Sequence, residues 1–117
     1  MPPPSKIRLH LKGDARRRLK DFSGLYNLKP SLKNSTYSVW EQDLGNNCIW
    51  FDIDSANWKV CKFSDIALRT CVISGPVALD DWPNEIQTNW KFADGLSYIK
   101  AGKQVTFKEG MIFFLSK

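Results

Sequence analysis

The sequence contains one histidine, His10, and only three cysteines among its 117 residues. Cys48, Cys61 and Cys71 form no Cys-x-x-Cys pair. A tetrahedral zinc site needs four such ligands, and a nucleophilic triad needs a base, usually histidine, beside its nucleophile. We therefore expect no metal, no cofactor and no enzymatic activity.

Three cysteines are also too few for the disulfide framework of a secreted domain, and an odd number cannot all pair with one another. Each lies in an apolar stretch that is typical of a buried strand. We expect reduced, structural thiols in an intracellular protein, and no disulfide among them.

Long apolar runs are missing as well. The longest is Met111–Leu115, whereas a membrane helix needs about 18–20 apolar residues. No apolar stretch near the start resembles a secretory signal, which favours an intracellular, cytoplasmic location. The arginine-rich start keeps a mitochondrial location open. The glycines are isolated, so the sequence contains no phosphate-binding glycine loop.

Acidic residues are scarce only near the start of the chain. The net charge is +5, yet residues 1–20 alone carry +6, with seven Lys or Arg and one acid. The remaining residues carry −1. We therefore expect a basic tail, residues 1–21, in front of a near-neutral domain, residues 22–117.

This predicted tail has three parts. Pro2–Pro4 favours an extended, polyproline-like backbone. Residues 6–12 alternate basic and apolar side chains, a pattern that would add as a strand to the sheet edge of a partner. Residues 15–20 are predicted to form a short helical turn with Asp14 as its N-cap. Truncation at residue 21 should accordingly leave the domain folded.

From Phe22 onward, aromatic residues and turn signals recur at the spacing of short strands, and no long amphipathic helix is indicated. We predict a mainly all-β fold, a small antiparallel β-sandwich or barrel with an extended basic N-terminal tail and at most one short helix. The expected strands are residues 24–28, 37–42, 48–53, 58–63, 71–74, 90–92, 96–99, 104–107 and 111–115. Residues 80–88 are expected to form a short helix or an irregular loop.

The clearest local prediction is a hairpin over Cys48–Phe63. A turn at Ser55-Ala56 would pair Ile53 with Trp58, and would place Cys48 and Cys61 diagonally on one face. Both faces are apolar, so this hairpin should be central and covered on both sides. A longer loop through residues 54–57 is the alternative, because Ser-Ala is not a preferred two-residue turn.

Two motifs invite a chemical interpretation. Asp52-x-Asp54 resembles the start of a calcium loop, but Ala56, Asn57 and Phe63 stand where ligands or glycine are needed, which favours a turn. Asp80-Asp81-Trp82 places two acids next to an aromatic ring, an arrangement found at sugar-binding sites. Among the five tryptophans, Trp82 is the best candidate for an exposed contact.

These observations favour a non-catalytic interaction subunit of a larger assembly, which could be cytoskeletal. Its β-domain would dock a protein partner and its basic segment would contact an acidic surface. One alternative is a nucleic-acid-associated, ribonucleoprotein subunit, and a second is a carbohydrate-binding module. The predicted partner-binding residues are Lys6, Arg8, Lys12, Arg16, Arg17, Arg18, Lys20 and Trp82.

Overall fold

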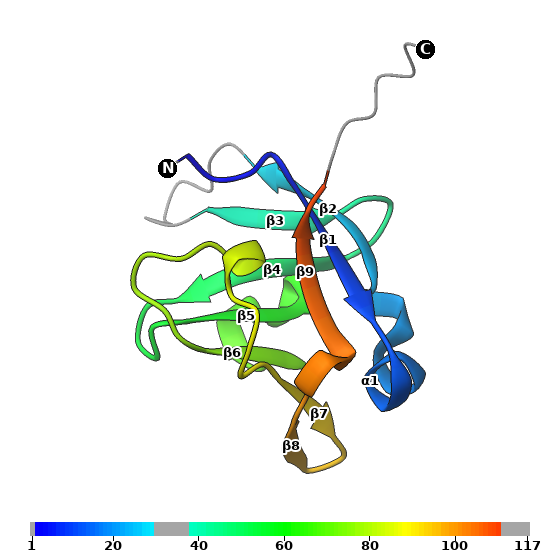
Figure 1. Ribbon diagram of the computed structural model, residues 1–117. Helices are drawn as coiled ribbons and strands as arrows, with labels where there is room; N and C mark the ends of the chain where they lie inside the picture. The colour runs from blue at the N-terminus through cyan, green and yellow to red at the C-terminus, as the bar shows by residue number, and fades with distance from the viewer. Residues whose placement is uncertain (1, 30–37, 111–117) are drawn as a thin grey trace.

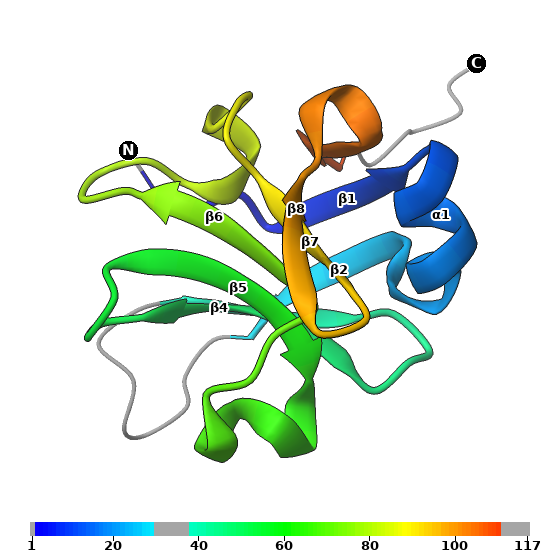
Figure 2. The same cartoon turned by 90° about the horizontal axis from the view of Figure 1, so that it is seen from below.

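The computed structural model describes residues 2–29 and 38–110, and within them the chain forms one curled antiparallel sheet with one short α-helix (Figures 1 and 2). The order of the strands is β8-β7-β6-β5-β4-β3-β2-β1-β9. The strands are β1 Lys6–Leu11, β2 Gly24–Lys29, β3 Val39–Gln42, β4 Asn47–Asp52, β5 Asn57–Lys62, β6 Ile73–Val77, β7 Lys91–Asp94, β8 Ser97–Lys100 and β9 Val105–Glu109.

The helix α1 spans Gly13–Leu19, and 3-10 turns occupy Lys20–Phe22, Phe63–Leu68, Pro83–Glu85 and Gly102–Gln104. The predicted all-β class with at most one short helix is confirmed. Of the two architectures expected, the curled sheet corresponds to an open half-barrel and not to a two-sheet sandwich. The strand expected at 111–115 lies outside the described residues.

The start of the chain differs from the expected tail, because residues 6–22 are part of the β-domain. Strand β1 lies between β2 and β9 and pairs with both. Ile7, Leu9 and Leu11 point into the core and are at most 5% exposed. The basic-apolar alternation thus belongs to a strand of the protein's own sheet. The expectation that this strand adds to the sheet edge of a partner is wrong. Asp14 lies in the first turn of α1, whose N-cap is Lys12 and not Asp14.

The hairpin β4–β5 is central, as predicted, but its register is shifted by two residues. Phe51 pairs with Trp58 and Asp52 with Asn57, so residues 53–56 form the loop. It is longer than a two-residue turn, and it begins and ends one residue earlier than the alternative loop through residues 54–57. Ala56 adopts a left-handed conformation there (φ 55°). Because the shift is an even number of residues, the side chains that remain in β4 and β5 keep their predicted faces. Ile53 and Phe63 lie outside the two strands and are exposed.

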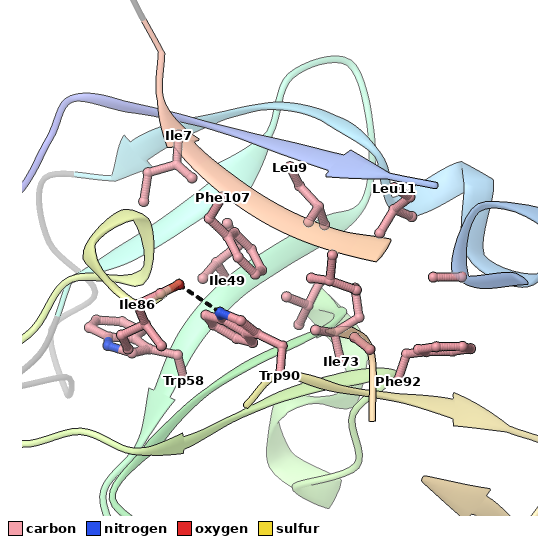
Figure 3. Packing of buried hydrophobic residues seen from close by; sticks show 14 of the residues in the cluster. Ile7, Leu9, Leu11, Ile49, Trp58, Ile73, Ile86, Trp90, Phe92 and Phe107 are labelled. Carbon is pink, nitrogen blue, oxygen red and sulfur yellow. Dashed lines mark hydrogen bonds between the residues drawn. The ribbon is translucent and has the colours of Figure 1, made fainter. Parts of the chain in front are cut away.

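The main core fills the concave side of the sheet (Figure 3). Trp40, Trp90, Phe92 and Phe107 are essentially fully buried there. The connection from β6 to β7 crosses this side: Ile86 and Trp90 pack in the core, and its turn Pro83–Glu85 contacts β9. The indole N–H of Trp90 donates to the carbonyl oxygen of Ile86 at 2.8 Å, which fixes this connection.

A second, smaller cluster covers the convex side of the central hairpin. It consists of Val39, Cys48, Trp50 and Cys61, with Ile66 and Cys71 packed against it. The turn Phe63–Leu68 contributes Ile66 to this cover. The expectation that both faces of the hairpin are covered is therefore confirmed, and burial on both sides explains its uninterrupted apolar pattern.

Candidate functional site

The outward side of β1 and β9 carries a concentration of basic residues, which we call the basic face: Lys6, Arg8, His10, Arg16 and Lys108. Along β1, inward residues are buried, whereas Arg8 and His10 are exposed. The register places Arg8 directly opposite Lys108 on β9, and His10 opposite Thr106. The face therefore combines two segments almost a hundred residues apart in the sequence.

Helix α1 brings a further cation to this face. Ala15 and Leu19 are its buried residues, and the backbone N–H of Ala15 donates to Oε1 of Gln104 at 3.1 Å. This docking leaves Arg16 exposed beside β1. Arg8, His10 and Arg16 together line a shallow hollow of about 290 Å³, whose other walls are Leu9, Leu11, Ser23 and Gly24.

The cations of the basic face are mostly not engaged in ion pairs with other described residues. Among the described residues, Arg8, Arg16 and Lys108 form no ion pair. Lys6 donates from Nζ to the side-chain oxygen of Asn27 on β2 at 2.6 Å, which holds it beside the strand pair. The positive charge of this face is thus left available to a ligand.

The other predicted cations are directed elsewhere. Arg17 pairs with Asp14 within α1, and Arg18 pairs with Asp94 of β7 at 2.7 Å. Lys12 and Lys20 are exposed at the two ends of α1. Of the seven predicted cations, the structure therefore gathers Lys6, Arg8 and Arg16. Sequence reasoning missed Lys108, because the β1–β9 pairing has no local signal. It also missed His10, although His10 follows Arg8 by two residues on the same strand.

Trp82 lies in a separate place, which we call the aromatic pocket. It is half-buried, not fully exposed, and its ring packs against Trp40 and Trp58 with centroids 6.1 Å apart in both pairs. The pocket has a volume of about 210 Å³ and is lined by Phe51, Trp58, Ala78, Leu79, Asp80, Asp81 and Trp82. It contains none of the predicted cations.

Asp52, the first residue of the suspected calcium loop, serves as an internal ion-pair partner. Its carboxylate accepts from Lys59 Nζ at 2.7 Å and lies 3.5 Å from Arg69, which also pairs with Asp54. Burial alone would raise the pKa of Asp52, but the hydrogen bond and charge of Lys59, with Arg69, lower it overall. Within the described part of the chain, no group of three or more His, Cys, Asp or Glu could hold a metal ion.

The three thiols are free, and the two buried ones face each other. Cys48 and Cys61 are directly opposite on β4 and β5, where a diagonal offset had been expected. The hydrogen bond to Cys61, together with burial, raises the pKa of Cys48, and the same hydrogen bond lowers the pKa of Cys61. Cys71 is half-buried with its Sγ 3.7 Å from the hydroxyl oxygen of Tyr98, and burial raises its pKa.

Two surfaces thus combine chemical groups that could bind a partner: the basic face and the aromatic pocket. The helices within the described ranges are all too short or too polar to cross a bilayer. No family model, no curated protein and no solved structure matches this chain.

Proposed function

We propose that this chain is a non-catalytic interaction domain whose basic face binds an acidic segment of a protein partner in a larger assembly. The observation that carries the proposal is the direct opposition of Arg8 and Lys108 on neighbouring strands. Like charges in this position destabilise a sheet. A bound carboxylate would turn this repulsion into two attractions.

The geometry around Arg8 also suits carboxylates. Arg16 and His10 border the same hollow as Arg8, so one acidic side chain there can contact more than one donor. Arginine pairs with carboxylates through two parallel N–H···O bonds, which adds direction to the attraction. The volume of the hollow suits the insertion of a side chain and not the docking of a whole folded surface.

A protein ligand is favoured over nucleic acid by the composition of the face. Single-stranded nucleic acids are usually held by exposed aromatic rings between the cations, on which bases stack. The residues lining the hollow include no aromatic ring other than His10. Beyond residue 20 the chain carries a net charge of −1, which adds nothing to the attraction for a phosphate backbone.

The proposal is tested by titrating the full chain with a fluorescent acidic peptide, for example a glutamate-rich 15-mer, and in parallel with single-stranded RNA of equal charge. Replacing Arg8 and Lys108 together by Ala should weaken peptide binding by about tenfold or more. Replacing Lys91 and Lys100 by Ala is the matched control, since they form the corresponding like-charge pair between β7 and β8.

Binding of the peptide should also weaken as salt rises, because exposed charges are screened within about 8–10 Å at physiological ionic strength. Equal loss of affinity in the two double variants would contradict a specific role for the basic face. Tighter binding to RNA than to the peptide, with a log–log salt slope of several units, would support the nucleic-acid alternative instead.

A further inference from the structure

The aromatic pocket is a second candidate binding site, on a different part of the surface from the basic face. Phe51 and Trp58 face each other across β4 and β5, with ring centroids 5.0 Å apart and planes at 71°. Trp82 arrives from the connection after β6 and is tilted by 49° to Trp58. Three rings in different planes therefore border one hollow.

The charges at this pocket are all of one sign. Asp80 and Asp81 line it, are exposed, and form no ion pair among the described residues. The lining contains no Lys, Arg or His. The faces of aromatic rings are themselves negative, so the rings and the two carboxylates all favour a positive ligand.

The polar atoms of the pocket also limit what it can bind. The indole N–H of Trp58 donates to the carbonyl oxygen of Asp81 at 2.8 Å and is not free for a ligand. Trp58 is only 2% exposed, so the ring surface that a ligand can contact comes from the half-buried Phe51 and Trp82. The site therefore presents π-systems and acceptors, which suits a cation with apolar substituents.

We propose that the aromatic pocket binds an alkylammonium group, with the side chain of a methylated lysine in a protein partner as its natural form. A volume of about 210 Å³ accepts a branched ammonium group, and it lies below the roughly 300–1,000 Å³ of pockets for larger ligands. Leu79, 78% exposed at the rim, offers apolar surface to the methylene stem of the lysine.

The test uses choline as the cationic probe and 3,3-dimethylbutan-1-ol as its uncharged counterpart of the same shape. Both are titrated into the full chain, and the signals of the tryptophan indole N–H groups are followed by NMR. Choline should shift the signals of Trp58 and Trp82 saturably, and the neutral alcohol should bind at least about tenfold more weakly. Equal affinity for the two probes overturns the proposal.

Variants separate the two contributions to binding. Changing Asp80 and Asp81 together to Asn should weaken choline binding severalfold, whereas Asp43→Asn, an exposed acid on the β3–β4 loop, should not. Trp82→Ala should abolish binding, and if that variant does not fold, the two probes and the Asn variants still decide. Unchanged choline affinity in the Asp80 and Asp81 variant contradicts a cation site.

Two further experiments distinguish the ammonium site from a carbohydrate site and test whether the aromatic pocket is independent of the basic face. Saturable shifts of the same indole signals with neutral monosaccharides, but not with choline, would overturn the ammonium site in favour of a carbohydrate site. Retained choline binding in the Arg8 and Lys108 double variant is expected, because the pocket shares no residue with the hollow of the basic face. Loss of choline binding there would contradict an independent pocket.

Discussion

The indole N–H of Trp40 on β3 donates a hydrogen bond of 2.8 Å to the carbonyl oxygen of Pro4, and both residues are buried. This bond fastens the proline segment to the core two residues before β1 begins. Pro2, Pro3 and Pro4 also border a hollow beside Trp82. Residues 2–4 are therefore part of the domain.

Deletion of residues 2–11 should unfold the protein. The deletion removes β1, so β9 loses the strand it pairs with and β2 keeps only β3. It also takes Ile7, Leu9 and Leu11 out of the core. Each buried Leu or Ile lost from a core costs about 2–5 kcal/mol. The dispersion of the NMR spectrum reports the outcome. Deletion of Pro2 alone, which is exposed, is the control and should preserve the fold. A folded 2–11 deletion would mean that β1 is dispensable.

The facing residues Phe51 and Trp58 offer a paired test of the packing. Trp58 is 2% exposed and packs on three rings, so Trp58→Ala should lower the free energy of unfolding by about 3–5 kcal/mol. Phe51 is half-buried, so Phe51→Ala should cost only about 1–2 kcal/mol. Urea denaturation measures both values. A larger loss for Phe51 than for Trp58 would contradict the burial described.

The sequence was informative wherever a pattern is local. Alternation along residues 6–12 predicted a strand, although in the sheet of a partner and not in the protein's own sheet, and the two-faced hairpin 48–63 was predicted as central. The strand starts and ends were mostly recovered within one or two residues, since turns with Gly, Asn and Asp delimit strands locally. Trp50 and Trp58 of this hairpin are 8% and 2% exposed, as the predicted cover on both faces requires.

Long-range pairing is what the sequence could not reveal. Nothing near Arg8 indicates that Lys108 will lie opposite it, because register between strands a hundred residues apart depends on the whole packed sheet. The charge count separated residues 1–20 from the rest, although Ile7, Leu9 and Leu11 belong to the common core. The charge count reflects only the exposed side chains of β1, and it gives no information on the buried side chains of the same strand. The aromatic pocket likewise needs Trp82 and Phe51 to meet from distant segments.

The thiols should differ in reactivity. Cys71 is half-buried, whereas Cys48 and Cys61 are 0% and 2% exposed. In the native protein an aromatic disulfide reagent should therefore modify one thiol, slowly because burial raises the pKa of Cys71. In denaturant without reductant it should modify three. A count of one under denaturing conditions would reveal a disulfide and contradict the free thiols.

The buried carboxylate of Asp52 should make stability depend on pH. Its pKa is below the ordinary value of 3.8 in the folded state, so its contribution is fully present above that value and is lost as pH falls through the folded pKa. Asp52→Asn should lower the free energy of unfolding by about 1.5–3 kcal/mol at pH 7, and by less in acid. Asp54→Asn is the control, since Asp54 is exposed and its ion pair contributes little. A pH-independent loss for Asp52→Asn would contradict this assignment.

Stability and binding should change in opposite directions at the basic face. Lys108→Glu replaces the repulsion with Arg8 by an attraction, so the free energy of unfolding should rise by about 0.2–1 kcal/mol. Lys100→Glu does the same opposite Lys91 and should give a similar gain. Only Lys108→Glu should abolish binding of the acidic peptide, because the new carboxylate occupies Arg8 and repels the ligand. Chemical denaturation and peptide titration of the two variants measure the two effects. If both variants bind the peptide equally well, the repulsion between Arg8 and Lys108 has no role in binding.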